Sequence, residues 1–107
     1  MQVEYIVDGN SVCITNLFVP EELRGCGLGL KALNEVCKEA YRLNIPFIKV
    51  DDMSDHYRQK NNIYLKAGFV YMDPTSGCEM MARTSTVSRY LKKNIYLEGK
   101  KKQIVQY

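Results

Sequence analysis

The chain has 107 residues, of which 46% are hydrophobic and 25% charged, the composition of an ordinary globular domain. This length supplies one hydrophobic core and predicts a single domain. No apolar run is long enough to cross a membrane, and the first residues lack the basic flank and apolar segment of a secretory signal. These features exclude a membrane protein and predict a cytoplasmic one.

The net charge of +3 is unevenly distributed along the chain. Residues 1–83 contain 9 basic and 11 acidic side chains, whereas residues 84–107 contain 6 basic and 1 acidic. The sequence therefore predicts a mildly acidic domain over residues 1–83 and a basic C-terminal extension over residues 84–107. The four cysteines form no C-x-x-C pair, and His56 is the only histidine. We therefore expect reduced thiols and no metal site.

The N-terminal segment has the pattern of a β-hairpin. Residues 2–7 alternate between apolar and polar side chains and lead to Asp8-Gly9-Asn10, which favours a tight turn because Gly and Asn tolerate positive φ. Residues 11–19 then read as the return strand. Their alternation breaks before Phe18, which predicts a bulge near Leu17.

Residues 28–43 carry apolar side chains at three- and four-residue spacing, which predicts an amphipathic helix. Asn44 and Pro46 are typical of the end of a helix. Residues 47–50 read as a short buried strand. A strand, a helix and a strand in this order predict a right-handed crossover that joins two parallel strands.

The next segment predicts a second helix and a second hairpin. Ser54 or Asp55 is a candidate cap for a helix ending near Lys66. Residues 69–72 and 78–82 read as strands on either side of a turn. The predicted fold is thus α/β, a mixed sheet in the order β-hairpin, helix, parallel strand, helix, β-hairpin.

Residues 84–107 leave two alternatives open. In one, residues 88–94 form a short helix, and residues 95–97 pair as a strand with residues 103–105. In the other, the whole segment is a solvated basic tail. Its lysines and its three tyrosines, Tyr90, Tyr96 and Tyr107, provide charges and stacking faces for nucleic acid, although lysines also serve only to keep a terminus soluble.

The stretch between the first hairpin and the long helix has the features of a phosphate-binding turn. Arg24-Gly25-Cys26-Gly27-Leu28-Gly29 lies between a β-branched strand and a helix start. Glycines allow the backbone to approach a ligand, and the first N–H groups of a helix carry partial positive charge. Arg24 adds donors suited to phosphate oxygens. The alternative is a tight turn whose glycines serve packing alone.

These residues resemble a known family. Arg24 to Gly29 are similar to the R/Q-x-x-G-x-G/A motif of GNAT-type N-acetyltransferases, and Tyr64-Leu65-Lys66-Ala67-Gly68-Phe69 is similar to the Y-x-x-x-G-F element of that family. The resemblance covers about residues 2–83. It implies a GNAT-like fold, acetyl-CoA as acyl donor, and transfer of acetyl to a primary amine by direct attack. Cofactor-binding residues implied by it are Leu17, Phe18, Val19, Arg24, Gly25, Cys26, Gly27, Leu28 and Gly29.

The same resemblance suggests catalytic residues. Tyr64 has the position of the acid that protonates the departing thiolate. The base is left open among Asp51, Asp52 and His56, which follow the parallel strand and lie where substrates enter α/β sheets. The alternatives are that Tyr64 packs on the sheet and that the loop acids are simply solvated. Tyr57 stands where many relatives have an asparagine, which puts one cofactor contact in doubt.

The resemblance also has a gap at its beginning. GNAT proteins usually have a strand and two helices before the hairpin, and these shape the acceptor site. We expect that a second copy in a homodimer, the basic tail or a partner protein completes this site, or that the acceptor lies in an open groove. The competing prediction is a non-catalytic module that binds an acidic partner or nucleic acid through its basic tail. The identity of the amine acceptor is not predicted.

Overall fold

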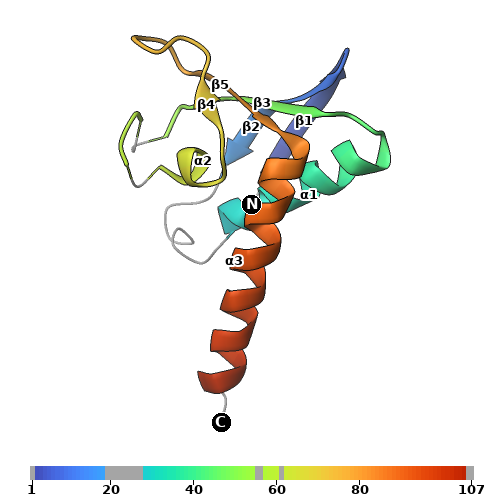
Figure 1. Cartoon of the computed structure of the whole chain (residues 1–107), viewed down its shortest axis with the longest axis vertical. Helices are drawn as coiled ribbons and strands as arrows, with labels where there is room; N and C mark the ends of the chain where they lie inside the picture. The colour runs from blue at the N-terminus through green and yellow to red at the C-terminus, as the bar shows by residue number, and fades with distance from the viewer. Residues whose placement is uncertain (1, 19–27, 55–56, 61, 106–107) are drawn as a thin grey trace.

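The computed structural model of the chain describes residues 2–18, 28–54, 57–60 and 62–105 (Figure 1). Over these residues the chain forms a five-stranded mixed sheet and three helices, which confirms the α/β class. The strands are β1 (Gln2–Asp8), β2 (Ser11–Phe18), β3 (Phe47–Asp51), β4 (Val70–Tyr71) and β5 (Glu79–Arg83). The helices are α1 (Leu28–Arg42), α2 (Ile63–Lys66) and α3 (Thr84–Val105).

The strand order in the sheet is β1-β2-β3-β5-β4. Only β2 and β3 run parallel, as predicted for strands joined through α1, and every other pair is antiparallel. The first hairpin turns at Gly9, whose φ is 60°. Its pairing steps from Glu4–Asn16 to Tyr5–Ile14, so the bulge lies at Thr15, two residues before the predicted position.

The core lies between one face of the sheet and the three helices, all of which contribute buried side chains to it. The helical spacing predicted for α1 is confirmed, because its buried side chains pack with Val87 and Leu91 of α3 over the central strands. The opposite face of the sheet is less buried over the described residues. On this face, the five side chains that lie opposite one another on successive strands are half-buried or exposed. These are Ile6, Cys13, Lys49, Met81 and Val70.

The second helix is much shorter than predicted. Residues 57–60 form turns, and α2 includes only Ile63–Lys66. Arg58 adopts φ +57°, a left-handed conformation that no residue within an α-helix adopts. Asn62, rather than Ser54 or Asp55, caps the helix through its side-chain oxygen, which accepts hydrogen bonds from the N–H groups of Tyr64 and Leu65.

The C-terminal segment is a single helix of 22 residues, so the predicted strand pair at 95–97 and 103–105 is wrong. Thr84, Val87, Ser88 and Leu91 are buried at helical spacing, and this packing nucleates a helix that good helix formers such as lysine then extend. Figure 1 shows α3 beginning against α1 and β5 and then projecting well beyond the sheet.

Gly68, which follows α2, occupies a position that requires glycine. Its φ is +103°, and a Cβ there would lie 2.5 Å from Cγ2 of Thr86 on α3. We expect Gly68→Ala to lower the free energy of unfolding by about 2–3 kcal/mol, because it adds a clash to an unfavourable backbone conformation. Chemical denaturation followed by circular dichroism measures this loss.

Two controls separate the clash from the backbone cost. Gly77 has φ +91°, but a Cβ at this position would meet no atom within 4 Å, so Gly77→Ala carries the conformational cost alone. Thr86→Ser removes the Cγ2 methyl, and Gly68→Ala in that background should cost no more than Gly77→Ala. Equal losses for Gly68→Ala with and without Thr86→Ser would contradict the clash.

Candidate functional site

The candidate site predicted from the sequence lies at the carboxyl end of the parallel strand pair. The register between β2 and β3 ends at Ile14–Val50, yet β2 continues to Phe18. The end of β2 therefore extends beyond its last partner on β3. Such a boundary at the carboxyl ends of parallel strands is where α/β sheets commonly bind ligands.

The structure describes only part of the predicted cofactor site. Val19, Arg24, Gly25, Cys26 and Gly27 lie outside the described residues, as does His56. Leu17 and Phe18 end β2, while Leu28 and Gly29 begin α1.

The first turn of α1 lies against α2. A Cβ built on Gly29 would approach Cδ1 of Ile63 to 3.4 Å. The start of α1 is thus next to the helix that carries Tyr64, which brings two of the predicted parts of the site together.

Tyr64 is buried, with 7% of its surface exposed. Its ring meets that of Phe69 edge to face, with 5.7 Å between the centroids. Burial, assisted by the negative charge of Asp52, raises the pKa of Tyr64 to about 12. The phenol therefore keeps its proton at neutral pH, so it is able to donate a proton or a hydrogen bond but is not a base. Its predicted catalytic role stays a prediction.

Asp52 is the centre of a buried hydrogen-bond network, and only 2% of its surface is exposed. Its carboxylate accepts four hydrogen bonds: from the backbone N–H of Ser54 at 3.1 Å, from the Ser54 hydroxyl at 2.5 Å, from Nδ2 of Asn62 at 2.8 Å and from the Tyr71 hydroxyl at 2.5 Å. These donors replace the water that the carboxylate loses on burial.

The surroundings of Asp52 bear on its predicted role as a base. Burial by itself raises the pKa of Asp52, but the hydrogen bonds from Ser54, Tyr71 and Asn62 outweigh it and hold the pKa below its ordinary value. A carboxylate stabilised in this way is a weak proton acceptor. The arrangement favours a role in positioning the loop over proton abstraction.

Asn62 joins this network to α2, a connection that the sequence reasoning missed. Its Nδ2 donates to Asp52 at 2.8 Å, while its Oδ1 accepts from the N–H of Tyr64 at 2.8 Å. The anchored carboxylate therefore fixes the cap of the helix that carries Tyr64. The preference of asparagine for N-cap positions is the sequence signal that identifies it.

Arg58 fastens the loop before α2 to the turn between β4 and β5. Its guanidinium donates to the backbone carbonyls of Asp73 at 2.7 Å, Pro74 at 3.0 Å and Gly77 at 3.1 Å, and it stacks on Tyr71 at 4.3 Å from the ring centroid. The Tyr71 hydroxyl also accepts from the N–H of Arg58 at 2.8 Å. Tyr71 therefore contacts both Arg58 and Asp52 and connects their two sets of hydrogen bonds.

A second candidate surface is the outer face of α3. Arg89, Lys92 and Lys93 are exposed there, on the side of the helix opposite the buried Val87 and Leu91. None of the three basic side chains forms an ion pair with a described residue. The backbone of α3 continues through residues 100–102, which are three further lysines.

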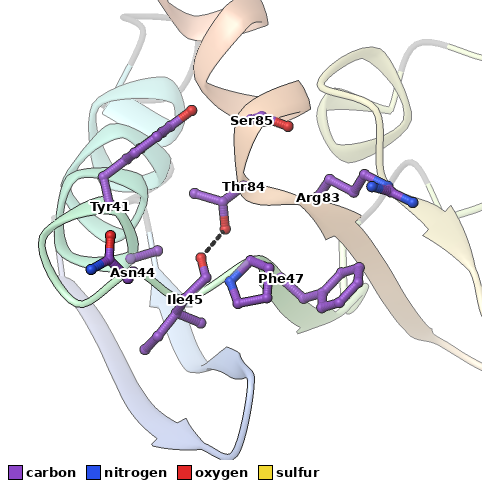
Figure 2. A pocket seen from close by; sticks show the side chains of 9 residues that line it. Tyr41, Asn44, Ile45, Phe47, Arg83, Thr84 and Ser85 are labelled. Atoms are coloured by element: carbon purple, nitrogen blue, oxygen red, sulfur yellow. Dashed lines mark hydrogen bonds between the residues drawn. The ribbon is translucent and has the colours of Figure 1, made fainter.

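A pocket of about 290 Å³ lies at the opposite end of the sheet from Asp52 (Figure 2). It is formed where the end of α1, the start of β3 and the start of α3 meet, and the Thr84 hydroxyl donates a hydrogen bond to the carbonyl of Ile45 beside it at 2.7 Å. Phe47 and Arg83 line its β-sheet side. None of the residues predicted for catalysis or cofactor binding lines this pocket.

Two further observations concern metal binding and membrane insertion. In the described part of the chain, no group of three His, Cys, Asp or Glu side chains is arranged to hold a metal ion. No helix among the described residues has both the length and the apolar character needed to cross a membrane.

Comparison with protein-family models found no match, and comparison with curated protein sequences found none either. Among solved structures, the chain is similar to one described as the crystal structure of a KacTA–DNA complex, with a TM-score of 0.55 and 15% sequence identity. The match covers 85% of this chain and 60% of the other chain. At this identity the similarity establishes a shared fold.

These findings correct the assignment to the GNAT-type N-acetyltransferases. No family model supports it, and the matched structure is described as a complex with DNA rather than as an acetyltransferase. The assignment depended on two short motifs, and glycines after a strand recur in unrelated folds because tight turns and close packing require them. What stands is a five-stranded α/β domain with a basic helix.

Proposed function

We propose that this protein binds nucleic acid through the outer face of α3. The observation that carries the proposal is the exposed basic set of Arg89, Lys92 and Lys93 on a helix that projects from the domain (Figure 1). Phosphate contacts from such side chains supply most of the affinity of nucleic-acid-binding proteins. The matched complex with DNA supports nucleic acid over an acidic protein as the partner.

The geometry of α3 suits a run of phosphates. Its 22 residues span about 33 Å at the helical rise of 1.5 Å per residue. Arg89 and Lys93 are one turn apart on one side of the helix, and Lys92 lies beside them. The first turns pack in the core, so these charges are held on a fixed support rather than on a free tail.

Fluorescence anisotropy with a labelled duplex of about 20 base pairs tests this proposal. We expect binding whose affinity falls linearly with salt concentration on logarithmic axes, because each contacted phosphate releases counterions. Absence of binding at low salt would contradict the proposal. Displacement by polyglutamate as effective as displacement by unlabelled DNA would also contradict it, in favour of an acidic protein partner.

A second candidate function, binding of acetyl-CoA and acetyl transfer to an amine, has its own supporting observation. The end of β2 extends past its last partner on β3, and Gly29 at the start of α1 lies against the helix that carries Tyr64. A helix N-terminus favours a diphosphate, and the protonated Tyr64 phenol suits a proton donor. In this proposal residues 24–29 hold the diphosphate.

Calorimetry with acetyl-CoA, followed by turnover assays with a panel of primary amines, tests this second candidate. We expect acetyl-CoA to bind, and the double variant Arg24→Ala, Gly27→Glu to lose binding. Tyr64→Phe should slow turnover about a hundredfold while acetyl-CoA still binds, since it removes only a proton donor. Absence of heat with acetyl-CoA would contradict the proposal, whatever the outcome with DNA.

A further inference from the structure

The outer edge of β1 is seven residues long and carries several exposed apolar side chains. β1 is the first strand in the sheet order, so one of its sides pairs with no strand among the described residues. Its seven residues include no lysine, arginine or proline, although such residues normally discourage pairing at an edge. Tyr5, Ile6 and Val7 are 37%, 56% and 52% exposed. Three consecutive apolar side chains are therefore exposed along this edge.

The opposite edge of the sheet differs. β4 has only two residues, Val70 and Tyr71. Short edge strands offer few unpaired backbone groups to a partner, and the hydroxyl and ring of Tyr71 are already engaged by Asp52 and Arg58. The edge available for strand pairing is therefore that of β1.

We propose that β1 pairs with β1 of a second copy of this chain, antiparallel and with Tyr5 opposite Tyr5 of the partner, to form a homodimer with one continuous sheet. Every second residue of an edge strand directs its N–H and C=O groups outward, and antiparallel pairing satisfies them. A two-fold axis is the usual symmetry of such a dimer and makes the interface self-complementary.

The charges of β1 favour this register over the two registers centred on the adjacent residues. Centring the pair on Glu4 places two glutamates opposite each other, and centring it on Ile6 places Glu4 opposite Asp8. Like charges in directly opposed positions destabilise a strand pair. Centring the pair on Tyr5 avoids both. It places Val3 opposite Val7, Glu4 opposite Ile6 and Gln2 opposite Asp8.

Analytical ultracentrifugation of the intact chain tests the proposal. It compares the association of the wild type with that of two variants that place opposite charges at position 6. We expect the wild type to sediment at twice its monomer mass of 12.3 kDa. Ile6→Glu sets a like charge opposite Glu4 twice in the dimer and should weaken association about tenfold or more. Ile6→Lys sets an opposite charge there and should keep or tighten the dimer. Circular dichroism verifies that each variant is folded.

Val70→Glu is the matched control, because Val70 is 60% exposed on the same face at the other edge of the sheet. It should leave the dimer unchanged. A wild-type chain that is monomeric at about 100 μM overturns the proposal, since that concentration would populate even a weak dimer. If Ile6→Glu and Ile6→Lys raise the dissociation constant of the dimer equally, the proposed register is wrong. If Ile6→Glu and Val70→Glu raise it equally, the interface is not at β1.

Discussion

Replacement of Asp52 with alanine is expected to lower the free energy of unfolding by about 3 kcal/mol, because it removes the acceptor of four hydrogen bonds at a buried site. The hydroxyls of Ser54 and Tyr71 lose their acceptor, and the fully buried Asn62 loses the 2.8 Å hydrogen bond from its Nδ2 to the carboxylate. The same substitution releases the cap of α2. Chemical denaturation followed by circular dichroism measures this effect, since the chain has no tryptophan.

Asp51 provides the matched control. It is the preceding aspartate, it is exposed, and it lies opposite Glu79 in the sheet register. Asp51→Ala should change stability by less than about 0.5 kcal/mol, as surface substitutions usually do. If the two alanine variants were equally stable, the Asp52 network would not be holding the loop.

The same pair of variants predicts a pH dependence. The folded state holds the pKa of Asp52 below its ordinary value, which is about 3.9 in an unfolded chain. The stability contributed by the ionised group is thus fully present above about pH 4 and is lost as the pH falls through the folded pKa. The stability difference between wild type and Asp52→Ala should therefore be large at pH 7 and shrink below pH 4. A difference that grew on acidification would contradict the role of the ionised carboxylate.

The sequence predicts the elements that local patterns determine. The hairpin around Gly9, the buried stripe of α1 and its end at Asn44, whose φ is 56°, all follow from residue spacing and from conformational preference. The parallel pairing of β2 and β3 follows from the crossover rule. These features need no knowledge of distant contacts.

The parts that could not be predicted depend on contacts between distant residues. The left-handed Arg58 is stabilised by carbonyls from the β4–β5 turn, more than a dozen residues away, and no local pattern indicates this conformation. The sequence pattern does not predict α3 as one helix, because its apolar spacing is regular only where it packs on the core, through Val87 and Leu91. The role of Asp52 as a buried anchor depends in the same way on Tyr71 and Asn62.

Neutralising the outer face of α3 is expected to have the largest effect on binding. The triple variant Arg89→Gln, Lys92→Gln, Lys93→Gln should lower the affinity for duplex DNA on the order of a hundredfold near 0.1 M salt, because each lost phosphate contact contributes about 0.9 to the salt slope. The slope itself should therefore decrease by about 2 to 3. The three side chains are exposed and form no ion pair within the described part of the chain, so folding should be unaffected.

A second triple variant, Lys38→Gln, Lys60→Gln, Lys66→Gln, distinguishes a binding face from a general effect of net charge. These lysines are also exposed but lie on α1, on the loop before α2 and on α2, and their replacement removes the same three positive charges. Net charge alone would weaken binding equally in both variants and lower both slopes alike. Direct phosphate contacts at α3 predict a steep loss only in the first variant, because counterion release depends on which charges meet the phosphates. Equal losses would remove α3 as the interface.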